Sequence, residues 1–145
     1  MRVLLDTNVI LDVLLAREPW VADAAQIWLM CSDGRFTGYA CASSITDIFY
    51  IARRLTDLTR ARAAVRLCLA TFMICPVDRA TLAMADGMPG DDFEDNLQIA
   101  CAILSNMDLI ITRDPDGFQQ SPIRAMTAGD LLQQFPTDAN GHGTV

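Results

Sequence analysis

Short apolar segments alternate with helix-length amphipathic segments along nearly the whole chain, and this alternation constrains the fold most strongly. Strands are expected at residues 2–5, 36–42, 72–77, 109–112 and 123–126. The stretches between the first four follow the i, i+3, i+4, i+7 apolar spacing of helices. Strands joined through helices form right-handed crossovers, which require parallel pairing. The pattern predicts an α/β, three-layer fold with a mostly parallel central sheet of about five strands and helices on both faces.

Helix boundaries follow from caps and turn residues. Ser43 or Ser44, Asp78 and Thr127 stand where a side-chain oxygen is expected to cap a helix. The expected helices span about 8–15, 20–32, 43 or 44 to the mid-fifties, 58–70, 78–86, 92–105 and 127–135.

The chain has 145 residues, enough for one compact domain. Residues 1–135 carry the pattern and are expected to form a single domain, and the polar, Gly-containing residues 136–145 a flexible tail. No run approaches the ~18 apolar residues of a membrane span. Asp6 and Asp12 interrupt the apolar N-terminus, which disfavours a signal peptide. A cytoplasmic protein is expected.

The five cysteines indicate the same compartment. They are odd in number and widely spaced, lie in apolar neighbourhoods and form no C-x-x-C pair, which disfavours zinc and thioredoxin-like chemistry. They are expected to be reduced core residues. They are Cys31, Cys41, Cys68, Cys75 and Cys101.

Charge is segregated along the chain. The net charge of −7 disfavours a protein that coats nucleic acid by bulk attraction. All basic residues are arginines, and five of the eleven fall within residues 53–66, where Asp57 is the one acid. Residues 86–95 hold five acids and no base. Such patches favour local over bulk electrostatic interactions.

Four aspartates are expected at one edge of the sheet. Asp6 directly follows the first strand, and Asp114 follows the strand at 109–112. Asp47 and Asp95 lie in the first turns of helices that begin at the same edge. Ligands of parallel α/β folds bind beyond the carboxyl ends of the strands. The positions therefore predict a cluster of carboxylates.

Each aspartate also has a local explanation. Asp6 suits a helix N-cap, Asp92-x-x-Asp95 has capping-box spacing, and Asp114 starts a Pro- and Gly-containing turn. Converging carboxylates repel one another unless a cation joins them. Oxygen ligands without a nearby His or Cys favour Mg²⁺, with Mn²⁺ as an alternative.

Four sequence motifs resemble those of the PIN-domain nucleases. They are DTN after the first strand, SSITD, DFEDNLQIACA and ITRD, in family order and spacing across residues 1–135. The chain is most similar to bacterial VapC-type toxins, and to a PIN branch with phrases such as ITDIFYIARR and DFEDALQ. The resemblance implies a PIN-like fold.

The resemblance also implies roles for particular residues. Asp6, Asp47, Asp95 and Asp114 match the acids that bind the metal and carry catalysis, and Asn8 and Thr112 match polar residues that support them. The second acid is more often Glu in the family, so the shorter Asp47 is expected to reach an ion directly or through water.

The activity implied is that of a Mg²⁺-dependent endoribonuclease that hydrolyses RNA phosphodiester bonds. Such a protein would be the toxin of a type II toxin–antitoxin pair, inhibited by a cognate antitoxin, and a homodimer. Arg53, Arg54 and Arg60 would contact RNA phosphates, or would simply form a solvated helix face. Phe49 and Tyr50 would stack on bases, or lie in the core and half-buried respectively.

Two other functions fit the sequence less well. A catalytically weakened PIN-like module would act by RNA or protein binding, and the presence of all four acids disfavours it. A phosphoryl-transfer enzyme with an Asp nucleophile, of the haloacid-dehalogenase-like type, would carry DxDxT after the first strand. Asn8 occupies the second Asp position of that motif, and no cap domain is evident.

Overall fold

The five predicted strands form one sheet in the computed structural model, which describes residues 1–135. The predicted tail, 136–145, lies outside the described residues. The elements in chain order are β1 (Arg2–Leu5), α1 (Thr7–Leu14), α2 (Val21–Ser32), β2 (Thr37–Cys41), α3 (Ala42–Leu55), α4 (Leu58–Thr71), β3 (Met73–Cys75), α5 (Arg79–Asp86), α6 (Phe93–Leu104), β4 (Leu109–Ile111), the 3₁₀ turn η1 (Pro115–Phe118), β5 (Ala125–Met126) and α7 (Ala128–Gln134).

The sheet has the strand order β3-β2-β1-β4-β5, and every neighbouring pair is parallel, so the predicted fold class is confirmed. β1 is central. Leu5 pairs in register with Ile111, so the residues that follow them, Asp6 and Thr112, leave the sheet side by side. The strand register alone therefore places Asp6, from the start of the chain, next to Thr112, from its last third.

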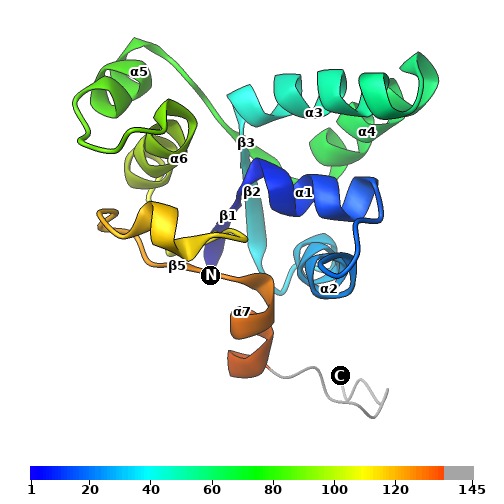
Figure 1. The fold of residues 1–145 in the computed structure, drawn as a ribbon. Coiled ribbons are helices and arrows are strands. Elements are labelled where there is room, and N and C mark those ends of the chain that lie inside the picture. The colour runs from blue at the N-terminus through cyan, green and yellow to red at the C-terminus, as the bar shows by residue number, and fades with distance from the viewer. Residues whose placement is uncertain (136–145) are drawn as a thin grey trace.

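Helices cover both faces of the sheet, as Figure 1 shows, with α5 and α6 on one side and α1 and α2 on the other. Side chains of β1 alternate between the two layers: Val3 and Leu5 enter one core cluster and Leu4 enters the other. All three are fully buried, and each such side chain contributes about 1.5–3 kcal/mol. The three-layer arrangement explains why β1 is apolar on both faces.

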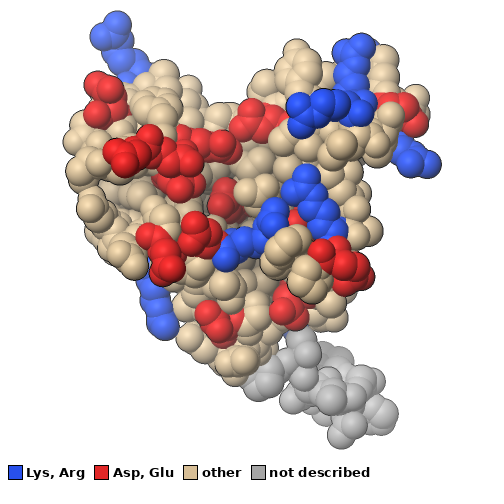
Figure 2. All heavy atoms as spheres, in the orientation of Figure 1, with Lys and Arg blue, Asp and Glu red and all other residues tan. Residues whose placement is uncertain are grey.

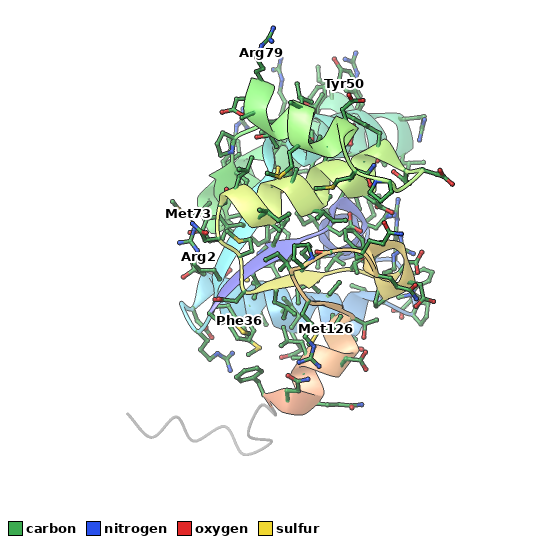
Figure 3. The ribbon with its side chains drawn as sticks, turned by 90° about the vertical axis from the view of Figure 1, so that its left-hand side faces the viewer. Arg2, Phe36, Tyr50, Met73, Arg79 and Met126 are labelled. Atoms are coloured by element: carbon green, nitrogen blue, oxygen red, sulfur yellow. The ribbon has the colours of Figure 1, made fainter. Side chains whose placement is uncertain are left out.

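The amino-terminal edge of the sheet is closed by Arg2. Its guanidinium donates to the backbone oxygens of Ser105 (2.7 Å) and Asn106 (3.2 Å) and lies 4.6 Å from the ring centroid of Tyr39. Figure 3 shows Arg2 and Met73, which begin β1 and β3, at the same side of the molecule. This arginine stabilises the carboxyl end of α6, where carbonyl oxygens need donors.

The α3–α4 hairpin projects from the rest of the molecule at the upper right of Figure 1. It carries five of the exposed large apolar side chains, which are Tyr50, Leu55, Leu58, Leu67 and Leu69. The apolar residues of α2 are less exposed as a group. There Ala24 and Trp28 are buried, and Leu29 is exposed.

Several local predictions were wrong by a few residues. β3 ends at Cys75 because Pro76 has no N–H for the ladder. α3 begins at Ala42 with Cys41 at the N-cap, so neither predicted serine caps it. Ser44 is fully buried and uses its hydroxyl elsewhere. Asp78 and Thr127 do cap their helices, accepting from the N–H groups of Thr81 and Asp130 respectively.

All five cysteines are buried and unpaired, as predicted. The sulfur atoms of Cys41 and Cys101 lie 2.9 Å apart, which joins the start of α3 to α6 through a thiol contact. Within residues 1–135, no helix has the length and apolar character needed to cross a membrane.

Replacing Gly38 in β2 by Ala should destabilise the fold. A Cβ there would stand 2.7 Å from Sγ of Cys31 and 2.9 Å from Cδ1 of Phe72, both packed in the core. Overpacking of this kind costs about 1–3 kcal/mol, measurable by urea unfolding. Gly87→Ala is the matched control, because its Cβ would meet nothing closer than 3.6 Å. Equal stability of the two variants would contradict the prediction.

Candidate active site at the carboxyl edge of the sheet

Asp6 ends β1 as a buried carboxylate. It occupies the N-cap position of α1 but makes no capping bond to that helix through its side chain. Its Oδ2 instead accepts a hydrogen bond of 2.9 Å from the hydroxyl of Thr112, at the end of β4. Burial raises the pKa of Asp6, although the Thr112 hydroxyl, the Thr7 N–H and the charge of Arg113 oppose the rise.

Thr112 also holds the segment that carries Asp114. Its Oγ1 accepts a hydrogen bond of 3.2 Å from the backbone N–H of Asp114. One buried hydroxyl therefore sets the position of two predicted acids, donating to the first and accepting from the second. The Thr112 hydroxyl contacts both Asp6 and the backbone of Asp114, and the supporting role predicted for Thr112 stays a prediction.

Asp95 and Asp114 face the same bare piece of backbone in η1. A Cβ on Gly117 would lie 2.9 Å from Oδ2 of Asp95 and 3.7 Å from Oδ2 of Asp114. Burial raises the pKa of Asp95 to about 6, and repulsion from neighbouring acids adds to the rise. Those acids are Asp92, Asp6, Glu94 and Asp114. The structure thus brings Asp6, Asp95 and Asp114 into one electrostatic cluster.

Asp47 joins this cluster through Glu94. Asp47 is half-buried in α3, and its charge raises the pKa of Glu94, after burial, which is the largest cause. Asp6 raises the same pKa further, and a 3.4 Å hydrogen bond from the Thr7 hydroxyl lowers it. Glu94 therefore stands between the second predicted acid and the other three.

A network of buried polar side chains includes Thr7, whose hydroxyl donates to Glu94. The hydroxyl of Thr7 donates to Ser44 at 2.7 Å, and the side-chain amide of Gln98 donates to Ser44 at 2.9 Å. The three side chains come from α1, α3 and α6, and all are buried. The amide oxygen of Gln98 accepts no hydrogen bond from the described residues. The network fixes the relative positions of the helices that carry the acids.

Asn8 and the predicted RNA-binding arginines make no hydrogen bond or ion pair with the four predicted acids among the described residues. Asn8 is exposed on α1, and no hydrogen bond joins it to an acid within residues 1–135. Arg53 and Arg54 are in the last turn of α3, about 9 Å along the helix axis from Asp47. Arg60 lies in the first turn of α4 and pairs with Asp57 at 3.8 Å.

Glu94 and the buried network were not anticipated as site residues. In the sequence, Asp92-x-x-Asp95 has the spacing of a capping box, and Asp92 does cap α6 by accepting from the N–H of Asp95 (3.1 Å), with Glu94 in the same first turn. One signal in the sequence could have indicated Glu94: it directly precedes the predicted site residue Asp95, in the first turn of the same helix. Thr7, which donates to Glu94, and Asp47, whose charge raises the pKa of Glu94, are distant in sequence, and spacing alone does not link them to it.

A basic side chain, that of Arg113, also lies near the acids, and its charge opposes the rise that burial causes in the pKa of Asp6. Arg113 lies between Thr112 and Asp114, and its Nε is 3.2 Å from Oδ2 of Asp12 in α1. Asp12 is 1% exposed and has Arg17 at 3.9 Å as a second ion-pair partner. Figure 2 shows acidic side chains around the hollow between the α5–α6 side and the α1–α3 side, with basic groups on its rim.

The carboxylate oxygens suit a hard cation, but they do not surround one completely. Among residues 1–135, no three Asp, Glu, His or Cys side chains lie close enough together to enclose a metal ion. Mg²⁺ is usually held by one or two carboxylates, several waters and the phosphates of a substrate. The raised pKa of Asp95, and the absence of a side chain at Gly117 beside Asp95 and Asp114, fit that mode of binding.

Asp95→Asn should stabilise the metal-free protein at pH 7. The pKa of Asp95 is about 6 in the folded state and 3.8 ordinarily, so ionised Asp95 opposes folding above pH 6. Between pH 6 and 4 this penalty fades, because the folded state takes up the proton first. Thermal unfolding in EDTA should show a gain of about 1 kcal/mol at pH 7, after discounting for solvent screening, and none near pH 4. Asp86→Asn, at the exposed end of α5, is the control, and an equal gain there would contradict the prediction.

Comparison with known proteins places this geometry in a family. The model of the PIN domain matches residues 2–116. A search of curated proteins finds no match. A toxin–antitoxin complex from Klebsiella pneumoniae is 19% identical, with a TM-score of 0.66, and the alignment covers 87% of this chain and 97% of that one.

Two further solved structures have similar folds. DNA-bound VapBC from Salmonella typhimurium is 14% identical (TM-score 0.67; 88% of this chain and 98% of that one). Mycobacterium tuberculosis VapC20, named as a sarcin–ricin loop cleaving toxin, is 13% identical (TM-score 0.63; 74% and 86%). The family match over most of the length, on a fold shared with these structures, shows that the chain belongs to the PIN domain family.

Proposed function

We propose that the protein is a metal-dependent endoribonuclease and the toxin of a type II toxin–antitoxin pair. The observation that carries the proposal is the cluster of Asp6, Asp95, Asp114 and Glu94 at the carboxyl edge of the sheet, where burial and then repulsion from neighbouring acids raise the pKa values of Glu94 and Asp95. Carboxylates that repel one another destabilise a fold, and a bound cation removes this repulsion.

Mg²⁺ or Mn²⁺, when bound, would lower the pKa of a water molecule and stabilise the leaving oxygen. Asp6, Asp95 and Asp114 would hold the cation, and Asp47 and Glu94 would hold it through water. Thr112 keeps Asp6 and the Asp114 backbone in place. The oxygen of water forms a bond to phosphorus as the P–O3′ bond breaks, and the leaving oxygen takes a proton. The products are a 3′-hydroxyl and a 5′-phosphate, and the ribose 2′-hydroxyl takes no part.

Two lines of support favour RNA and a toxin role. VapC20, which shares the fold, is named for cleaving the sarcin–ricin loop, an RNA element. Several other similar structures are toxin–antitoxin complexes. The arginines of the α3–α4 hairpin, Arg53, Arg54 and Arg60, are exposed and would contact phosphates flanking the cleaved bond, although Arg60 also pairs with Asp57 at 3.8 Å.

A second candidate is a PIN-like module with weakened catalysis that acts by RNA or protein binding. The wide spacing of the acids favours it, because within the described chain no three of them converge on one point. The short side chain of Asp47 favours it too. Substrate phosphate completes many magnesium sites, however, so the wider spacing is compatible with catalysis.

Cleavage of single-stranded or looped RNA should require Mg²⁺ or Mn²⁺ and stop with EDTA. Asp6→Asn should reduce the rate at least ~100-fold, because it removes a fixed metal ligand at the end of a rigid strand. Gel analysis of a labelled RNA, with mapping of the product ends, measures both the rate and the chemistry.

The control for that experiment is Asp86→Asn, which removes an equal charge that is not among the causes of the raised pKa values of Asp6, Glu94 and Asp95 and should cleave normally. Full activity in EDTA would refute metal-dependent hydrolysis. RNA binding without cleavage at any metal concentration would favour the binding module instead.

The proposal includes two partners, a second copy of the chain and an antitoxin. The apolar surface of the α3–α4 hairpin, with Tyr50 at 61% and Leu69 at 56% exposure, suits burial in a protein interface. An antitoxin that reaches the acids should present a cation, and an arginine suits the carboxylates best. Such an inhibitor and Mg²⁺ would compete for the same charges.

The purified protein should therefore be a dimer at micromolar concentration, as measured by light scattering. Inhibition by its antitoxin should weaken as Mg²⁺ is raised from about 0.1 to 10 mM, since ion and guanidinium exclude each other. A monomer would disprove the first expectation. Inhibition that is constant across the titration, at fixed ionic strength, would disprove the second.

A further inference from the structure

A second recess lies beside the carboxylate cluster. Its volume is about 220 Å³, and its walls include Trp20, Asp23, Arg113, Thr127 and Gly129. Thr112 belongs to both places, because it lines the recess while its hydroxyl donates to Asp6. A ligand bound at the acids therefore lies next to the recess.

Trp20 and Arg113 form a flat platform at this recess. The guanidinium carbon of Arg113 lies 4.1 Å from the ring centroid of Trp20, so it stacks on one face of the indole. Trp20 is nevertheless 43% exposed, whereas the other tryptophan, Trp28, is 7% exposed and belongs to the core. Unpaired RNA bases stack on aromatic rings and on guanidinium planes.

Asp12 holds this platform in place. Both of its oxygens are buried and accept no hydrogen bond from the described residues, so its contacts with Arg113 (3.2 Å) and Arg17 (3.9 Å) are ion pairs without aligned donors. A buried carboxylate of this kind strongly favours a nearby guanidinium. Asp12 is thus a positioning residue for Arg113.

Hydrogen-bonding groups border the platform. Asp23 lies at the recess with its Oδ2 3.0 Å from where a Cβ on Gly129 would stand, and the Thr127 hydroxyl is 3.9 Å from that point. The absence of a side chain at position 129 keeps this space open. The recess therefore presents a carboxylate acceptor, with Arg113 and a hydroxyl as donors.

We propose that the recess binds one unpaired guanine of the RNA, stacked on Trp20, with Asp23 accepting from its N1–H and N2 amino groups. Guanine alone among the four bases offers two adjacent donors for one carboxylate, and its O6 can accept from Thr127 or Arg113. Uracil would place a carbonyl oxygen against Asp23. This inference rests on the proposed function and adds base selectivity to it.

The test uses mononucleotides first, so that it does not depend on cleavage. GMP, IMP and UMP are titrated against the full-length protein in EDTA, with tryptophan fluorescence as the signal and calorimetry for variants of Trp20. Binding should weaken in the order GMP, IMP, UMP, because IMP lacks the N2 amino group. Equal binding of GMP and UMP would overturn the assignment.

Variants then identify the groups that act. Trp20→Ala should weaken GMP at least ~10-fold, and Trp20→Phe should restore most of the loss, as expected of stacking. Asp23→Asn should abolish the preference for GMP over IMP. Leu29→Ala, an exposed site on the same helix, and Asp86→Asn are matched controls and should bind GMP as the wild type does. Unchanged GMP binding by a folded Trp20→Ala protein would also overturn the proposal.

Cleavage separates this inference from the proposed function. RNA hairpins that differ only in one loop base, guanine or uracil, are digested in Mg²⁺. Cleavage without base preference, together with no binding of GMP, would refute the guanine site and leave the nuclease standing. Selective GMP binding without cleavage of any RNA would refute the nuclease and leave the site standing.

Discussion

The pairing of β1 with β4 is the constraint on which the candidate site depends. These strands are parallel and in register, so Asp6 and Thr112 emerge together and form a buried hydrogen bond of 2.9 Å. The same Thr112 oxygen accepts from the N–H of Asp114. A hydrogen bond to a charged group contributes about 1.5–3 kcal/mol, enough to hold a carboxylate that burial disfavours. Two acids thus take their positions from one strand pair.

The remaining acids depend on helix packing, which transmits the sheet geometry outward. Asp47 enters on α3, and Glu94 and Asp95 on α6, while Thr7, Ser44 and Gln98 form the buried contact between these helices and α1. Hydrogen bonds in this network are between side chains with hydroxyl or amide groups, so its geometry is sensitive to small changes in packing. The strand ends fix the positions of Asp6 and Thr112, and the helices add the charges of Asp47, Glu94 and Asp95 to the site.

The sequence predicted the parts of this arrangement that follow from local pattern. The alternation of strands and helices is a strong signal, and it placed Asp6 and Asp114 at one edge of the sheet. Pairings between distant residues carry no local signal: neither the Thr7–Glu94 contact nor the burial of Asp12 under Arg113 is visible in the spacing. Ser44 is the clearest example of a residue whose place the local pattern did not predict. A serine near the start of a helix suits an N-cap, but in the structure Ser44 is fully buried and Cys41 is the N-cap.

The contacts that complete the site join residues very far apart in the chain. Thr112 to Asp6 spans 106 positions, Gln98 to Thr7 spans 91 and Glu94 to Thr7 spans 87. Contacts of such separation are slow to form, because the entropy of closing a long loop is lost before the contact stabilises the chain. During synthesis, a nascent chain cannot assemble its acids until Thr112 has left the ribosome. The carboxylate cluster is therefore one of the last features of the described domain to be completed as the chain is made.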